Sequence, residues 1–228
     1  MNSRKHIFIL LMLVGAVATA CVAQTWDATR DFAAYNPNGA WSYGSAVTGT
    51  SFTLYTSYDT DCADTWGVQG LVCWSGEIFY HDPLVGFNTT GNWLNFSTVV
   101  MPSDVLCVHP APDWQPADSI VQWTAPLTAT YRISGFFEIL DTNPTGIIGL
   151  IFLNSKPLYH GELLGPPAQH PDRAGGREDF YFANLSLNAG DVISFGVNSD
   201  SNFNNDSTGF NATIVTPTNA PPCAVCSQ

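Results

Sequence analysis

The sequence predicts an all-β protein, an antiparallel β-sandwich of the jelly-roll type. Apolar and polar residues alternate over many short segments, most clearly in Ala129–Ile139, where Tyr131, Ile133 and Phe137 share one face. Gly, Pro, Asn and Asp residues separate these segments, and no segment keeps a helical period. Many short strands with turn residues between them are typical of sandwiches and jelly rolls.

The first element is an expected secretory signal over residues 1–23. Basic residues precede the apolar run Ile7–Val17, and small residues follow it. Cleavage after Ala23 would release a secreted protein, whereas cleavage before Cys21 would give a lipoprotein anchored at that cysteine. The run is shorter than the ~20 apolar residues of a membrane-spanning helix, and no later run is long enough. The mature chain is therefore expected to be extracellular or at the cell surface, without a transmembrane segment.

The rest of the chain is expected to be one β-sandwich domain over residues 24–216, followed by a Pro- and Cys-containing tail over 217–228. No linker divides the domain. Each expected strand is a run rich in β-branched and aromatic residues between turn residues. These runs are Ala40–Tyr43, Ser51–Tyr58, Gly70–Trp74, Ile78–Tyr80, Leu94–Val100, Ser119–Thr124, Ala129–Ile139, Gly146–Leu153, Leu158–Leu163, Asp179–Leu187, Val192–Val197 and Gly209–Thr216.

Two connections between these runs carry specific expectations. Ser119–Thr124 and Ala129–Ile139 are joined by a short Pro-containing polar turn, which predicts a β-hairpin. The Pro-rich stretch Pro102–Pro116 is expected to be a crossing loop whose apolar residues, Trp114 included, are buried.

The acidic balance of the chain limits its partners. It has 7 basic and 19 acidic side chains, a formal net charge of −12. Once the signal is removed, Lys156 is the only lysine. Binding to nucleic acid or to an anionic membrane requires cationic side chains, so neither partner is expected. Neutral ligands and cations suit this charge better.

The six cysteines fit an exported chain, in which disulfides form. Spacing alone does not fix their pairing. Cys62 and Cys73 are expected to pair and to close a short acidic loop. Loss of Cys21 with the signal would leave an odd cysteine, which predicts a free thiol or a disulfide-linked partner.

Several segments resemble the β-sandwich domains of bacterial secreted surface proteins, many of which carry PEP-CTERM sorting tails. The segments that carry the resemblance are Val108–Pro110, Ile120–Pro126, Thr130–Phe137, Ala189–Phe195 and Asp206–Gly209. The resemblance covers about Trp26–Ile214 and implies a jelly roll similar to carbohydrate-binding modules. The chain departs from the pattern at its end, Cys-Ala-Val-Cys-Ser-Gln, where the sorting tail is absent.

Aromatic side chains are the candidate ligand-binding residues, because indole rings stack on the apolar faces of sugars. All seven tryptophans precede residue 124. Trp41 and Trp123 lie in or beside expected strands, so they are expected in the core. Trp66 and Trp93 have turn-like neighbours and are expected to be exposed, since loops on a rigid scaffold carry most binding residues.

A candidate Ca²⁺ site lies in the polar segment 200–206. Its oxygen-bearing side chains fall at every second position: Asp200, Asn202, Asn204 and Asp206. Ca²⁺ takes about six to eight oxygen ligands, although the Gly and Glu of an EF-hand loop are missing here. The alternative is a polar hairpin loop held by Asx turns, without an ion.

The sequence shows no catalytic signature, since it has no nucleophile elbow, zinc-protease motif or nucleotide-binding loop. It therefore predicts a non-catalytic extracellular β-sandwich that binds a glycan or another surface polymer. One alternative is a structural surface or matrix protein with an intermolecular disulfide. Another is a polysaccharide-active enzyme, for which two suitably spaced carboxylates would be enough.

Overall fold

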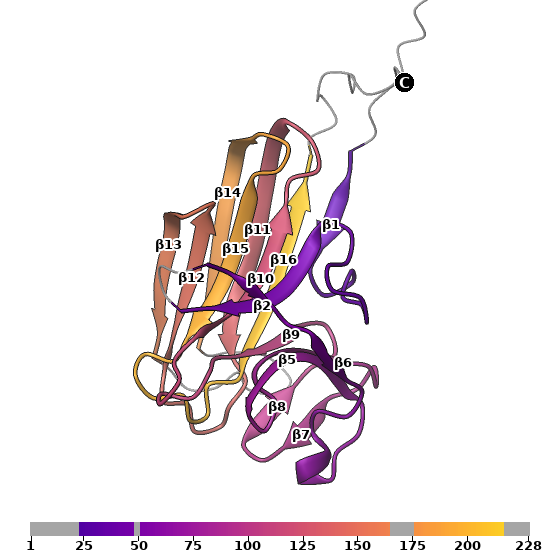
Figure 1. Ribbon diagram of the computed structural model, residues 1–228, viewed down its shortest axis with the longest axis vertical. Coiled ribbons are helices and arrows are strands. Elements are labelled where there is room, and N and C mark those ends of the chain that lie inside the picture. The colour runs from indigo at the N-terminus through magenta and orange to yellow at the C-terminus, as the bar shows by residue number, and fades with distance from the viewer. Residues whose placement is uncertain (1–22, 48–50, 165–175, 217–228) are drawn as a thin grey trace, which may run out of the picture.

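Two antiparallel β-sheets lie face to face in the computed structural model (Figure 1), which describes residues 23–47, 51–164 and 176–216. The only helix in these ranges is the single 3₁₀ turn η1 (Asp64–Trp66). No helix in the described ranges is long and apolar enough to cross a membrane. The predicted all-β sandwich is confirmed. The expected signal sequence, apart from Ala23, and the tail over 217–228 lie outside the described residues.

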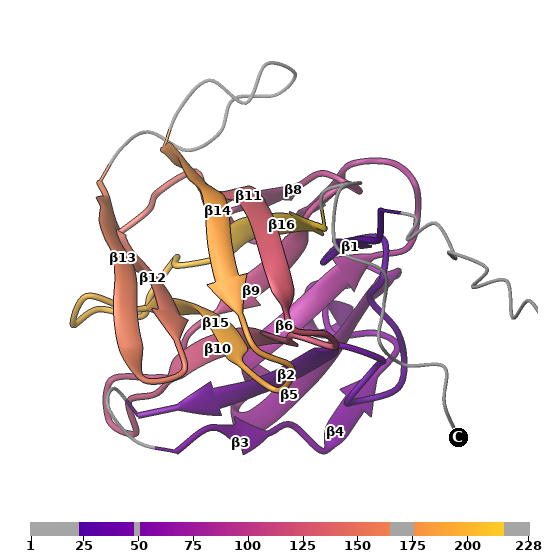
Figure 2. The same ribbon diagram turned by 90° about the horizontal axis from the view of Figure 1, so that it is seen from above.

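The first sheet is the larger one. Its strands, in spatial order, are β14 (Arg177–Leu187), β11 (Ala129–Ile139), β16 (Thr208–Val215), β9 (Leu106–His109), β6 (Asp82–Asn88), β5 (Leu71–Phe79) and β4 (Ser57–Asp59), and β1 (Thr25–Asp27) pairs with the strand β16. The second sheet consists of β13 (Lys156–Leu163), β12 (Ile147–Leu153), β15 (Val192–Asn198), β10 (Asp118–Thr124), β2 (Trp41–Ala46) and β3 (Thr53–Leu54). A separate ribbon is formed by β7 (Leu94–Phe96) and β8 (Val99–Met101). Figure 2 shows β13 and β14, one edge strand of each sheet, at the same side of the sandwich.

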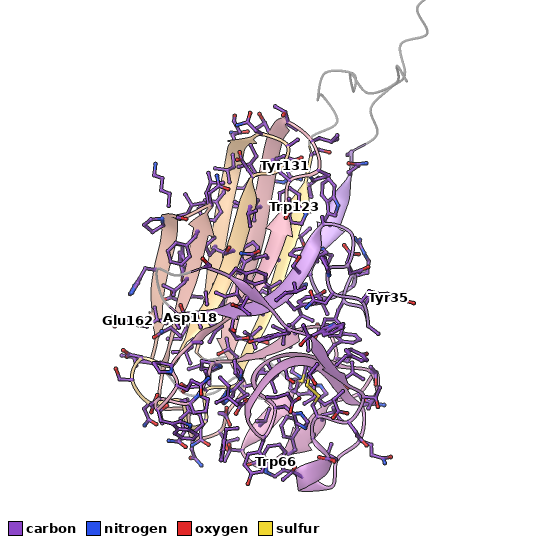
Figure 3. The ribbon with its side chains drawn as sticks, viewed as in Figure 1. Tyr35, Trp66, Asp118, Trp123, Tyr131 and Glu162 are labelled. Carbon is purple, nitrogen blue, oxygen red and sulfur yellow. A yellow bond between two sulfur atoms is a disulfide. The ribbon has the colours of Figure 1, made fainter. Side chains whose placement is uncertain are left out.

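The chain changes sheet at almost every connection after β9, as in a double-sheet jelly roll. This overturns the expected hairpin, because β10 and β11 lie in facing sheets. Each strand nevertheless buries the expected face. Trp123 of β10 and Tyr131 of β11 meet edge to face across the interior, with ring centroids 5.0 Å apart (Figure 3). The alternation thus identified the buried side chains but not the pairing partner.

Two apolar clusters fill the molecule. The main core lies between the sheets, and its largest fully buried side chains are Trp41, Trp123, Tyr43, Tyr131, Phe137, Phe195 and Phe210. The second cluster lies beside the ribbon of β7 and β8, and includes Leu71, Met101, Leu140 and the sulfur atoms of Cys62 and Cys73. The expected burial of Trp41 and Trp123 is confirmed.

Strands β1, β6 and β9 are absent from the sequence prediction. Pro83 is the second residue of β6, and proline within a run argues against a central strand. The four residues of β9 lie inside the stretch expected to be a crossing loop, yet they pair with both β6 and β16. The segment Leu94–Val100 also differs, because the left-handed φ of 48° at Ser97 divides it into β7 and β8.

The two ends of the described sandwich lie side by side. β1 pairs with β16. Beyond them the backbone N–H of Gln24 donates to Thr216 Oγ1 at 2.9 Å, and the N–H of Thr216 donates to the carbonyl of Gln24 at 3.0 Å. In Figure 1 these ends lie at the top, whereas β7 and β8 lie at the bottom.

Glu138 is an acidic residue on the outward face of β11 that is fully buried. Arg177 covers this face, with its guanidinium 3.6 Å from Glu138 Oε2 and 3.5 Å above the ring of Phe136. Burial raises the pKa of Glu138 to about 7, and the nearby Arg177 opposes the rise. Since the folded state holds this proton more tightly than the unfolded chain, stability falls as pH rises from the ordinary pKa to about 7.

We therefore expect Glu138→Gln to reduce the pH dependence of stability. The free energy of unfolding of the unmodified protein should fall by roughly 2–3 kcal/mol between pH 4.5 and 7.5 through this group alone. The variant should lose that part of the slope, which urea unfolding at several pH values would measure. Glu162→Gln, on the exposed side of β13, is the matched control. An equal change of slope in both variants would contradict the assignment to Glu138.

Candidate functional site: an aromatic patch and its pocket

Five aromatic side chains gather at one end of the sandwich, and we call Trp66, Phe79, Tyr80, Trp114 and Phe203 the aromatic patch. The first four expose 44%, 39%, 56% and 63% of their surface, and Phe203 is half-buried. Figure 3 places Trp66 at the bottom of the molecule, away from the described chain ends. A contiguous exposed apolar surface of this kind marks an interaction site.

The patch is continuous because each ring contacts the next. Trp66 lies 6.2 Å from Tyr80, and Tyr80 lies 4.5 Å from Phe79, measured between ring centroids. Phe79 meets Trp114 edge to face at 5.3 Å. Trp114 meets Phe203 in the same way at 5.4 Å. Four segments distant in sequence thus form one surface.

Trp66 is positioned by a disulfide and by a turn. Cys62, just before η1, is bonded to Cys73 of β5, as expected from the sequence, and their Cα atoms are 6.1 Å apart. η1 ends at Gly67, whose φ of 70° is open to glycine and strained for other residues. The ring of Trp66 also packs on Phe96 at 5.6 Å. The loop that carries the indole is therefore tied to the sheet at both of its ends.

Tyr80 occupies the turn between β5 and β6 with a left-handed φ of 51°. This conformation is uncommon for an aromatic residue. Strain of this kind persists only where the surrounding structure imposes it, and it clusters at ligand-binding sites. Tyr80 therefore joins the patch at a strained position.

A pocket of about 170 Å³ opens beside the patch. Its aromatic wall consists of Trp66, Phe79, Tyr80, Phe96 and Phe203, and its polar groups include Asp82, Thr98, His109, Asp141, Asn204 and Asn205. The volume is below the ~300–1,000 Å³ of pockets that enclose drug-sized ligands. It suits one small ring, with the exposed part of the patch available to the rest of a longer ligand.

Asp82 and His109 face each other within this pocket. His109 Nδ1 lies 3.3 Å from Asp82 Oδ1 and 2.9 Å from the carbonyl oxygen of Pro110. Burial raises the pKa of the Asp82 carboxyl, and the charges of His109 and His81 oppose the rise. The pair offers a ligand two polar groups for hydrogen bonding, the carboxyl of Asp82 and the imidazole of His109.

Asp141 forms hydrogen bonds that hold the wall of the pocket together. It is buried, and its Oδ1 accepts a hydrogen bond from the Thr98 hydroxyl at 2.5 Å. Its Oδ2 accepts one from the backbone N–H of Ser207 at 2.7 Å. Thr98 Oγ1 also lies 3.1 Å from Asn205 Oδ1. These bonds join the ribbon of β7 and β8 to the segment before β16.

The four side chains expected to hold Ca²⁺ do not form one cluster, although two of them, Asn202 and Asn204, contact each other. Asp200, Asn202 and Asn204 are exposed, and Asn202 Oδ1 accepts a hydrogen bond from Asn204 Nδ2 at 2.8 Å. Asp206 is buried. The reason is the left-handed backbone at Asp200, Ser201 and Asn205, with φ values of 44°, 74° and 59°, which interrupts the regular alternation of side chains.

The two tryptophans expected to be exposed have different positions. Trp66 is exposed and lines the pocket. Trp93 is half-buried in the turn before β7 and is not among the residues that line it. The expectation for Trp114 is wrong, because its ring is exposed at the patch.

The cysteines of the described residues leave no accessible thiol. Cys107 is free, but it is buried in the second cluster, and burial raises its pKa. It cannot reach a partner chain without unfolding. Cys62, Cys73 and His81 lie close enough to hold a metal, but the disulfide occupies both sulfur atoms. Cys21, Cys223 and Cys226 lie outside the described residues.

The histidines of the described chain show no nucleophile arrangement. His109 contacts Asp82, Pro110 and Phe203, and no described hydroxyl or thiol forms a hydrogen bond with its imidazole. Nucleophilic catalysis needs such a bond between base and nucleophile.

A second hollow, of about 230 Å³, lies on the outer face of the second sheet. Phe52 and Phe152 line it together with Gln122, Ser194 and Asn154. The Gln122 side chain donates to Ser194 Oγ at 3.0 Å. This hollow has fewer aromatic residues than the patch, and it provides an alternative location for a ligand.

Comparison with known proteins gives only distant likenesses. No family model matches the sequence, and no curated protein matches it significantly. These two comparisons therefore give no support to the resemblance to surface proteins with sorting tails. Similar solved structures include carbohydrate-binding modules, with identities of 11–14% in the three described next.

A family 35 carbohydrate-binding module from an environmental isolate is 14% identical, with a TM-score of 0.31, over 62% of this chain and 83% of the module. The CBM35 of Paenibacillus barcinonensis is 12% identical, with a TM-score of 0.32, over 85% of this chain and 98% of that one. The tandem CBM51 modules of a family 98 glycoside hydrolase from Streptococcus pneumoniae are 11% identical, with a TM-score of 0.37, over 82% of this chain and 49% of that one. The two-sheet sandwich is established by its strand pairings.

Proposed function

We propose that the protein is a non-catalytic extracellular domain that binds a neutral glycan at the aromatic patch. The observation that carries this proposal is the continuous row of five rings beside a pocket with polar groups. Exposed rings offer flat surfaces to the apolar faces of sugar rings. The pocket groups Asp82, His109 and Asn204 can exchange hydrogen bonds with sugar hydroxyls.

Charge favours a neutral glycan over an acidic one. The chain carries a formal net charge of −12, and two carboxylates, Asp82 and Asp141, line the pocket. An anionic sugar would be repelled by these groups and would find no arginine or lysine among the residues that line the pocket. The proposal therefore excludes uronic and sulfated ligands.

The proposal also includes a structural Ca²⁺ ion at the loop over 200–206. That loop carries Phe203 and Asn204 to the wall of the pocket. Holding it in place would preorganise the site for its ligand. Export, expected from the N-terminal sequence, belongs to the same proposal, and detection of the protein in the culture medium of its producing cells would test it.

Substitution within the patch should weaken glycan binding strongly. We expect Trp66→Ala and Tyr80→Ala each to raise the Kd for a neutral polysaccharide by about tenfold or more, which corresponds to ~1.4 kcal/mol. Retention on insoluble polysaccharides and a glycan array would identify the ligand, and calorimetry would give the Kd. Tyr181→Ala is the matched control, because Tyr181 is an exposed ring on β14, outside the patch.

The outcomes separate the hypotheses. If Phe152→Ala weakens glycan binding while both patch variants bind normally, the ligand site lies in the second hollow. Absence of binding to every glycan tested would contradict the proposal and favour a structural role. Release of reducing sugar by the purified protein would contradict its non-catalytic part.

A further inference from the structure

The hydroxyl of Thr145, just before β12, is surrounded by three oxygen atoms. Thr145 Oγ1 lies 2.8 Å from the carbonyl oxygen of Asn202, 2.7 Å from that of Asn204 and 2.7 Å from Asp206 Oδ1. All three distances are those of hydrogen bonds. Three hydrogen bonds to one hydroxyl would need three protons on these contacts.

The cluster does not contain enough protons. A hydroxyl carries one proton, and backbone carbonyl oxygens only accept. A protonated Asp206 would add a second proton, which it could donate to Thr145. At least one oxygen pair at hydrogen-bond distance therefore lacks a proton in every protonation state. Close contacts between electron-rich oxygens indicate a place for a cation.

A second observation points in the same direction. Asp206 is 1% exposed, and its Oδ2 has no hydrogen-bond partner. None of the described basic side chains forms an ion pair with it. Three further carboxylates, Asp113, Asp141 and Asp200, act on it through their negative charge. A buried carboxylate in such surroundings is costly unless positive charge is supplied.

We propose that Asn202 O, Asn204 O, Thr145 Oγ1 and the carboxylate of Asp206 bind one Ca²⁺ ion. Carbonyl and carboxylate oxygens are ligands that Ca²⁺ accepts in irregular geometry, with water completing the shell. Mg²⁺ demands a more regular octahedron, so it should bind more weakly. Backbone carbonyls replace the side chains of Asn202 and Asn204 that the sequence suggested, and Asp200 lies outside the ligand set.

This inference makes the structural ion of the proposed function specific and does not require that the ligand be a glycan. The ion would hold residues 202–206, including Phe203 of the aromatic patch, against Thr145. Asn204 and Asn205 line the pocket in the same stretch. The ion would thus fix one wall of the pocket.

Calcium binding to the full chain, in the absence of any glycan, is the test. After chelation, Ca²⁺ at 100 times its Kd should raise the melting temperature by roughly 5–10 °C. Mg²⁺ at the same concentration should raise it less, and calorimetry with Ca²⁺ should give one site. Asp206→Asn should weaken Ca²⁺ binding by at least about tenfold. Asp200→Asn removes the same charge from an exposed neighbour and should keep the affinity within about threefold.

Two results would overturn the inference. One is an unchanged melting temperature with no heat of Ca²⁺ binding, which would mean that a protonated Asp206 alone stabilises the loop. The other is an equal loss in Asp200→Asn and Asp206→Asn, which would indicate diffuse attraction to acidic residues. If Asp206→Asn does not fold, Thr145→Ala takes its place with the same expected loss. Failure of glycan binding with intact Ca²⁺ binding would count against the proposed function alone.

Discussion

Replacing Trp123 with alanine is expected to lower the free energy of unfolding by about 3–5 kcal/mol. The side chain is fully buried between the sheets. It meets Trp26 edge to face at 5.4 Å and Tyr131 at 5.0 Å, so truncation would leave a cavity bounded by rings from the facing sheet. A loss of this size is a large part of the 5–15 kcal/mol that stabilises most domains.

Trp123→Phe separates packing from polarity at the same position. Trp123 Nε1 is buried without a hydrogen-bond partner. An unsatisfied buried donor lowers the free energy of unfolding by roughly 1–3 kcal/mol, and phenylalanine has no such donor. We expect the phenylalanine variant to lose less than half of what the alanine variant loses. Guanidinium unfolding followed by circular dichroism would measure both. Both variants lack the indole N–H, so equal losses would show that the phenylalanine ring recovers none of the packing of Trp123.

Removing the disulfide is expected to have the second largest effect. Loop-closure entropy for a bridge over a sequence separation of 11 gives a loss of about 3 kcal/mol in Cys62→Ala/Cys73→Ala. Alanine suits the site because both cysteines are buried among apolar side chains, where serine would add unpaired hydroxyls. Trp66 lies inside the closed loop, so glycan binding should weaken as well.

Thermal unfolding and the same binding assay would measure the two effects of this double variant. Cys107→Ala is the control, because it removes a buried sulfur atom that belongs to no bridge. For stability, this control should lose about 1 kcal/mol. A double variant as stable as the unmodified protein would show that the bridge contributes nothing to folding. Normal affinity in the double variant would show that Trp66 is placed by its ring contacts alone.

The fold class was predictable because alternation is a local property. In β11 the expected residues Tyr131, Ile133 and Phe137 are all buried. Pairing is not local, and for this reason β10 and β11 were expected in one hairpin although they lie in facing sheets. The sequence does not predict β6, because Pro83 disfavours a strand in its local context. The pairing of β6 with β5 and β9 overrides that preference.

The site was predictable only in part. Trp66 could be found because turn residues surround it. Tyr80 was assigned to a strand end, and Trp114 to a buried loop. Phe203 had a usable signal, since a single aromatic ring within the polar segment 200–206 has no local reason to be there. That these rings touch one another follows from tertiary packing, which no local pattern contains.

The adjacent ends at Gln24 and Thr216 determine how the domain would be displayed. They lie at the pole of the sandwich opposite Trp66 (Figures 1 and 3). Whatever is joined at either end, whether a neighbouring domain, a solid support or a fluorescent label, meets the molecule at the same pole. The aromatic patch would then face outward from the support regardless of which end is used. Immobilisation through either terminus should therefore leave glycan capture equally efficient.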